Sequence, residues 1–162
     1  MNAEAFRQYY GYHFSQNYIL WEYFISELSD EEFTQETGYS QGSVRNQFVH
    51  MINADDVWFS ELSGVDPLGF PENGNDRRNI QAYMDSVVQL MQAYLAGLQD
   101  EMLFSTPITE PDDDQDLIVW QVLLHVVNHG TDHRAQILRQ LNEMGLSTPP
   151  QDYIFYVYEN QD

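Results

Sequence analysis

The stretch IVWQVLLHVVNHGTDHRAQILRQL, residues 118–141, decides the fold of this 162-residue chain. Apolar side chains recur in it at steps of three and four residues, the spacing that places them on one face of an α-helix. They are Ile118, Val119, Val122, Leu123, Val126, Ile137, Leu138 and Leu141. The pattern predicts a long amphipathic helix that begins at Asp114 or Asp116 with an acidic first turn and ends with Gly145 as its C-cap.

Three more stretches carry the same helical periodicity. We expect helices over residues 2–28, 43–62 and about 76–98, the third capped by Asn75 or Asp76. The inner face of the first is strongly aromatic. Four long helices in a chain of this length indicate an all-α fold, a four-helix bundle.

The connecting segments complete this picture. Residues 29–32, Ser-Asp-Glu-Glu, end the first helix and begin a short helical turn. Residues 102–109 alternate in character and predict a short extended strand or hairpin arm before the last helix. The tail, residues 149–158, is too apolar to remain in water, so we expect it to pack back on the bundle or on a partner subunit. Residues 1–162 are expected to form one domain.

Composition narrows the function classes. The chain has no cysteine, so any thiol nucleophile must come from outside the protein. Its first residues lack the basic start and apolar run of a signal peptide, and no stretch approaches the length of a membrane span. We therefore expect a soluble cytoplasmic protein.

Charge is the second unusual feature. The 26 acidic residues stand against six arginines and no lysine, for a formal net charge of -20. Such a surface repels phosphate, which argues against nucleic acid and anionic membranes as partners. High solubility or a salty cytoplasm explains the acidity better than mimicry of nucleic acid, because the acids are scattered rather than arrayed in rows.

Three of the five histidines, His125, His129 and His133, recur at intervals of four residues. Residues four apart lie one above the other on a helix, so either adjacent pair can bind a divalent metal. The outer two are separated by about 12 Å of helical rise and cannot easily share one ion. The choice between 125/129 and 129/133 stays open, as does the alternative that these are ordinary core histidines.

Facing helices must supply the remaining ligands of such a metal, because one helix surface cannot surround an ion. His50 is the natural third ligand and His13 the reserve, although each can also be a half-buried polar group. Three histidines leave a tetrahedral position for water or substrate, as in catalytic metal sites. Imidazole suits zinc, nickel, copper or iron, and the spacing does not choose among them.

Two motifs carry a resemblance to a known family. FVHMINADDVW, residues 48–58, and HVVNHGTDHRAQI, residues 125–137, resemble the DinB/YfiT-like family of metal-binding four-helix bundles. Residues 12–17 and 149–154 resemble the first helix and the tail of that family, so the likeness spans almost the whole chain.

The resemblance implies a divalent metal, nickel or zinc, with His50, His129 and His133 as its ligands. His125 matches a histidine often seen one turn earlier, which implies a lining role. The family often reads His-His-Arg-Gly-Gln where this chain has Asp-His-Arg-Ala-Gln at residues 132–136. Asp132 lies about 100° around the helix from His133, so this departure should spare the ligands.

Some relatives in the resembled family activate a low-molecular-weight thiol at the metal. The resemblance therefore implies a metal-dependent thiol S-transferase that joins an exogenous thiol to a small electrophilic substrate. A metal-dependent hydrolase and a noncatalytic metal-binding stress-response protein are the alternatives. Relatives also imply a homodimer. Asn17, Asp55 and Arg134 are candidates for orienting ligands or substrate, or are simply helix contacts.

Overall fold

The computed structural model describes residues 1–71, 76–108 and 116–160, and these residues form helices and loops without a strand. The helical elements in chain order are α1 (Ala3–Tyr23), the 3-10 helix η1 (Ile25–Glu27), α2 (Asp30–Thr34), α3 (Val44–Ser63), α4 (Arg77–Gly97), the 3-10 helix η2 (Asp100–Phe104), α5 (Val119–Glu143) and α6 (Tyr153–Glu159). The expected all-α fold is confirmed.

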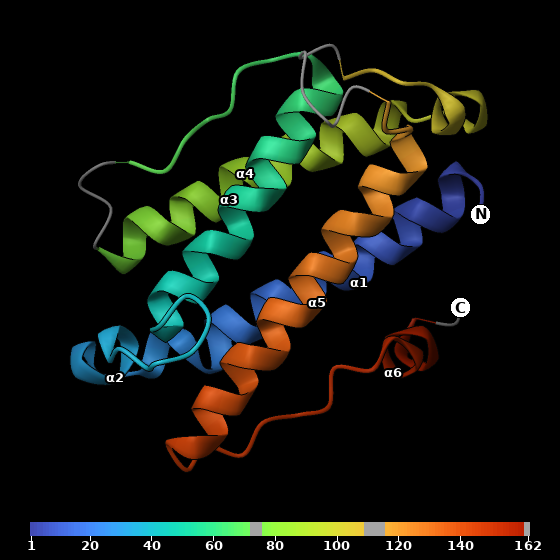
Figure 1. Cartoon of the computed structure of the whole chain (residues 1–162). Helices are drawn as coiled ribbons and strands as arrows, with labels where there is room; N and C mark the ends of the chain where they lie inside the picture. The colour runs from blue at the N-terminus through green and yellow to red at the C-terminus, as the bar shows by residue number, and fades with distance from the viewer. Residues whose placement is uncertain (72–75, 109–115, 161–162) are drawn as a thin grey trace.

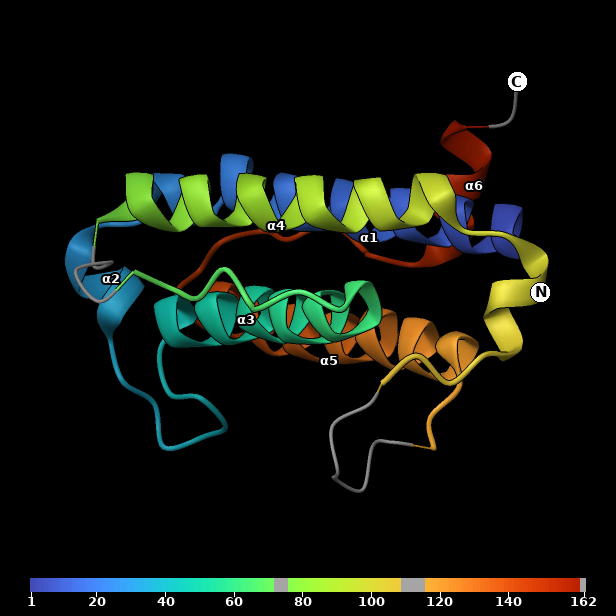
Figure 2. The ribbon, with the colours of Figure 1, turned by 90° about the horizontal axis from the view of Figure 1, so that it is seen from above.

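The four long helices form a bundle of two layers. Figure 2 shows α1 beside α4 in one layer and α3 beside α5 in the other. Each long helix packs against two neighbours, in the order α1, α4, α3, α5 around the bundle (Figure 1). The face that α3 turns toward α5 is therefore an interior seam between two long helices, which is where side chains from two elements can converge.

Helix starts follow capping chemistry that the sequence predicts. Ser29 and Glu32 form a reciprocal capping box at the start of α2. The Asp76 side chain accepts from the backbone N–H of Arg78 and caps α4, which decides between the two residues expected there. Ser43 caps α3, and Gly64 ends that helix in the left-handed conformation at φ 66°.

Two predicted boundaries were wrong. The first helix ends at Tyr23 instead of residue 28, because the backbone of Phe24 leaves the helical conformation at φ -128° and the separate 3-10 helix η1 follows. The last long helix begins at Val119 rather than at Asp116, and its first turn holds no acid. The side-chain carbonyl of Gln121 accepts a hydrogen bond from the Ile118 N–H. A neutral amide therefore satisfies this backbone donor at the helix start, where an acidic side chain was expected. Residue 114, the other expected start, lies outside the described residues.

The strand or hairpin arm expected over residues 102–109 is absent from the described part of that stretch, residues 102–108. Met102–Phe104 belong to the 3-10 helix η2, and residues 105–108 follow without regular structure. The Ser105 hydroxyl donates to the carbonyl of Met102, and the backbone carbonyl of Ser105 accepts from the N–H of Val119. This short connection ties η2 to the start of α5. Residue 109 lies outside the described residues.

The core is aromatic, as the first helix predicted. The rings of Tyr10 and Phe59 meet edge to face at 5.3 Å, and those of Trp21 and Phe48 lie 5.0 Å apart. The buried Tyr10 hydroxyl donates to the carbonyl of Leu123 at 2.8 Å. These contacts join α1 to both α3 and α5, so the spacing of the helices is set by large rigid side chains.

The C-terminal tail packs back on the bundle, as expected, and adds a helix that the sequence pattern did not indicate. The Tyr153 ring packs edge-on against Tyr9 and Tyr12 at 5.1 and 5.3 Å. Gln151 accepts hydrogen bonds from Tyr12 and Arg134. Two apolar side chains of α6, Ile154 and Phe155, are 47% and 45% exposed. None of the helices among the described residues has the length and apolar character needed to cross a membrane.

Candidate metal centre

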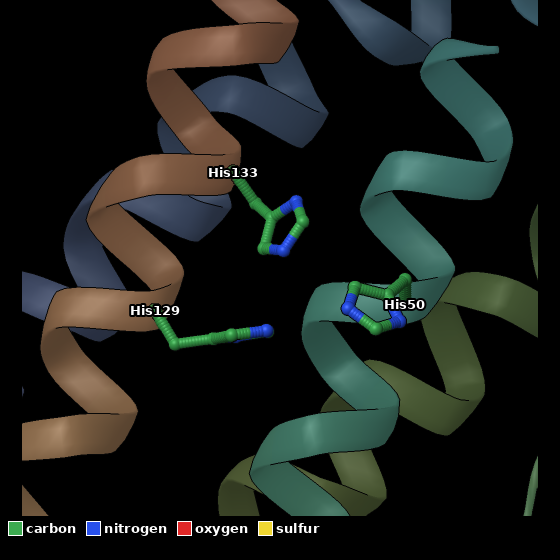
Figure 3. A group of neighbouring side chains, drawn as sticks. All are labelled: His50, His129 and His133. Carbon is green, nitrogen blue, oxygen red and sulfur yellow. The ribbon is translucent and has the colours of Figure 1, made fainter. Parts of the chain in front are cut away.

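Three histidines converge on the seam between α3 and α5. His50 comes from α3, whereas His129 and His133 come from successive turns of α5 (Figure 3). One ring nitrogen from each lies within 4.8 Å of those from the other two. The ring centroids are 5.2 Å apart for 50 and 129, 4.7 Å for 50 and 133, and 4.4 Å for 129 and 133. The structure thus brings together the three residues predicted as ligands.

The fourth histidine of the seam, His125, lies outside this cluster. Its side chain is exposed, its ring stands 5.8 Å from that of His129, and it meets Trp58 edge to face at 5.3 Å. Of the two spacings that the sequence left open, the pair 129/133 faces His50. The reason is axial: His50 lies opposite the later turns of α5, whereas Trp58 occupies the level of His125.

His13, the reserve ligand, is committed elsewhere. Its ring is fully buried, and its Nε2 lies 3.0 Å from Oδ2 of Asp55. Nη1 of Arg134 lies 3.2 Å from its Nδ1 and 2.7 Å from Oδ1 of Asn17. Of the two roles that the sequence left open for His13, reserve ligand or buried polar group, the structure supports the second, because both ring nitrogens already face protein partners.

The two charged partners of His13 favour one proton arrangement in this buried network, in which the Asn17 amide nitrogen, 3.2 Å from Nε2, does not donate to the ring. A guanidinium has no lone pair, so Nδ1 of His13 must accept from Arg134 and its Nε2–H must donate to Asp55. A neutral imidazole thereby bridges a buried cation and a buried anion. The three candidates for orienting groups, Asn17, Asp55 and Arg134, all belong to this network, which crosses the bundle from α1 to α3 and α5.

Gly130 makes the network possible. A Cβ on this residue would lie 2.9 Å from Nδ1 of His13 and 3.1 Å from Nη1 of Arg134, and closer still to Cε1 of His13. A glycine inside a helix costs stability, so its presence here is explained by the close approach of α1 to α5. It follows His129 directly, and therefore the packing that holds His13 also sets the position of α5 beside the histidine cluster.

Burial keeps part of the cluster neutral. Desolvation, followed by the nearby His133 and His50, lowers the pKa of His129 from 6.5 to about 4. Burial and the nearby His50 also lower the pKa of His133. Neutral imidazoles keep their lone pairs, and a metal ion must otherwise compete with protons for them.

The donor set fits a divalent metal ion of borderline softness. Nδ1 of His129 is buried without a hydrogen-bond partner among the described residues, which is costly for a polar atom unless a ligand satisfies it. Nδ1 of His133 lies 2.7 Å from Oε1 of Gln47, an arrangement that orients the ring as in many metal sites. Nitrogen donors of this kind suit zinc, nickel, copper or iron rather than calcium or magnesium.

Gln47 is a functional candidate that the sequence interpretation missed. It is fully buried and lies three residues before His50, so the two side chains share a face of α3. A buried glutamine on the inward face, one turn from a predicted ligand, was the available signal. Its partner could be identified only when α5 was placed opposite.

Two comparisons with known proteins bear on the chain as a whole. The model of the DinB family matches residues 1–162. Protein DinB of Bacillus subtilis (strain 168) is 27% identical over 143 residues, which cover 83% of this chain and 83% of that protein. The family match includes α3, α5 and the tail, and it agrees with the resemblance that the two histidine motifs indicated.

Proposed function

Since this chain belongs to the DinB family, we propose that it binds a divalent metal ion through His50, His129 and His133 and acts as a metal-dependent thiol S-transferase. The observation that supports the metal site is the convergence of three imidazoles from two helices within 4.8 Å. Nickel and zinc are the ions that we expect, because three nitrogen donors suit both.

The site leaves room for chemistry. Three protein ligands do not complete a tetrahedral coordination shell, which is the mark of catalytic rather than structural sites. A bound divalent ion would favour the thiolate form of a small thiol at neutral pH. His50 and His129 are only half-buried, so a small molecule can approach the cluster from solvent. Because the chain has no cysteine, that thiol must be exogenous.

Metal content tests the first half of this proposal. Protein purified without chelators should carry close to one equivalent of nickel or zinc by elemental analysis. Substituting His50, His129 or His133 with alanine should remove most of it, because two imidazoles hold a divalent ion much more weakly than three. His125→Ala is the matched control, since this histidine lies on the same helix one turn from His129 and outside the cluster. Equal metal content in all four variants would refute the ligand assignment.

Thiol consumption tests the second half. The metal-loaded protein should consume small thiols in the presence of electrophiles, and His133→Ala should abolish the reaction. A protein with stable stoichiometric metal and no turnover with any thiol or electrophile would instead favour the noncatalytic metal-binding alternative. Hydrolysis of ester or amide substrates without a thiol would favour the hydrolase.

Two further expectations stay proposals. A homodimer is supported by the exposed apolar side chains of Ile154 and Phe155 on α6, which a second copy can cover. Light scattering on the purified protein measures the mass directly, and a monomer at every concentration would contradict it. The cytoplasmic location also remains a prediction.

A further inference from the structure

A run of hydrogen bonds leads from the buried centre to the surface. Nδ1 of His133 lies 2.7 Å from Oε1 of Gln47, and Nε2 of Gln47 donates to Oε1 of Gln136 at 2.9 Å. Nε2 of Gln136 in turn donates to Oδ2 of Asp132 at 3.0 Å. The run therefore begins at one candidate ligand on α5, crosses to α3, and returns to the residue that precedes the same ligand in sequence.

The carboxylate at the end fixes the direction of the whole run. An ionised carboxylate only accepts hydrogen bonds, so Gln136 must turn its NH₂ toward Asp132 and its carbonyl oxygen toward Gln47. Gln47 must then turn its own NH₂ toward Gln136 and its carbonyl oxygen toward His133. The last group to be decided is the imidazole, whose Nδ1 must carry the proton. This deduction does not depend on how the amide atoms are assigned, because the carboxylate allows only one assignment.

The consequence concerns the other ring nitrogen. A neutral imidazole carries one proton, so a proton on Nδ1 leaves Nε2 bare. The opposite tautomer would set the lone pair of Nδ1 against the carbonyl oxygen of the fully buried Gln47, where water cannot relieve the repulsion. Each amide in the run also polarises the next one. Through these two neutral groups, the negative charge of Asp132 favours a proton on Nδ1 of the His133 ring.

We propose that Asp132 is a positioning residue that acts through Gln136 and Gln47 to hold His133 in the Nδ1–H tautomer, with Nε2 free before any metal arrives. The carboxylate is exposed and Gln136 is half-buried, so the run couples the surface to the buried ring. Its value for metal binding rests on the proposed function, but the tautomer itself does not.

The tautomer can be read directly in the full-length metal-free protein. Long-range proton–nitrogen correlation spectra of ¹⁵N-histidine-labelled protein at pH 7.5 distinguish a protonated Nδ1 from a bare one, and His133→Gln assigns the signal. We expect wild-type His133 to show protonated Nδ1 and bare Nε2. Asp132→Asn keeps the shape of the exposed side chain but removes the acceptor-only end, and it should move the signal toward a mixture of both tautomers. Gln47→Leu, which removes the direct acceptor, should move it further.

Glu143→Gln is the matched control, because it neutralises another exposed acid of α5 that pairs with Arg139 instead. It should leave the His133 signal unchanged. A wild-type ring protonated on Nε2, or an unchanged signal in Asp132→Asn, would overturn the inference. Gln47 is buried and its variant can destabilise the fold, so the Asp132 variant decides the question.

Zinc affinity separates this inference from the proposed function. With a chromophoric competitor, Gln47→Leu should weaken zinc binding by about 10- to 100-fold, the range known for outer-shell partners of metal-bound histidines. Asp132→Asn should weaken it less. If wild-type protein binds no zinc, the metal proposal fails while a tautomer shift still supports the inference. If zinc binds and the tautomer never shifts, the inference fails alone.

Discussion

Gly130→Ala tests whether the buried His13 network sets the position of α5. The new Cβ would lie 2.9 Å from Nδ1 of His13 and 3.1 Å from Nη1 of Arg134. His13 is fully buried and bonded at both ring nitrogens, so it cannot swing away without losing Asp55 or Arg134. The structure therefore predicts a loss of stability, although alanine is the better helix former.

The magnitude follows from three contributions. Overpacking a tight site costs about 1–3 kcal/mol. Displacing His13 from a buried guanidinium leaves a donor poorly satisfied, at a cost of about 1–3 kcal/mol. Helix propensity returns about 1 kcal/mol. The net loss in the free energy of unfolding is on the order of 3 kcal/mol, which for a chain of this length lowers Tm by roughly 6–12 °C.

Urea denaturation followed by circular dichroism measures this loss. Gly97→Ala is the control, because Gly97 also lies in a long helix and a Cβ there would meet nothing within 4 Å. In a His13→Ala background the clash with His13 disappears and the 3.1 Å approach to Nη1 of Arg134 remains. The cost of Gly130→Ala should therefore fall by about 2 kcal/mol, a coupling well outside additivity. If Gly130→Ala is as stable as wild type, the argument that this glycine exists for His13 is wrong.

Three further predictions concern the cluster and its surroundings. Without metal, the free energy of unfolding should fall as pH drops from 6.5 toward 4, because the pKa of His129 is about 4 in the folded state and the unfolded chain takes up the proton first. Urea denaturation of chelator-treated protein should show a shallower pH dependence for His129→Asn than for wild type. An equal pH dependence in both proteins would contradict this. Zinc at a hundred times its dissociation constant should stabilise the protein by about 2.7 kcal/mol, measurable as a rise in Tm of roughly 5–10 °C that His133→Ala loses and His125→Ala keeps. Asp56→Ala should lower the free energy of unfolding by about 3 kcal/mol in urea denaturation, because the buried carboxylate accepts from two loop N–H groups and from the Tyr83 hydroxyl at 2.7 Å. A decrease below about 1 kcal/mol would show that water replaces the carboxylate as the acceptor for these groups.

Local signals in the sequence were sufficient to predict the four long helices and the row of histidines on α5, but not to choose between the pairs 125/129 and 129/133. Ser29 with Glu32 and the Asp76 cap act within a few residues, so their helix starts could be predicted without a fold. The spacing of His129 and His133 also needs only one helix. The start of α5 could not be predicted in the same way, because Asp116 offered an acidic cap that the chain does not use.

The sequence alone therefore determined that this chain forms long amphipathic helices and that one of them presents imidazoles at intervals of four residues, since both properties depend on the repeat of a single helix. Only the tertiary structure decided that His50 faces that pair, that His13 is bound to Asp55 and Arg134, and that Gln47 and Asp132 join the outer surroundings of His133. These contacts depend on the axial offset and the rotation of each helix relative to its neighbours. Close packing between side chains that are far apart in the sequence sets both quantities.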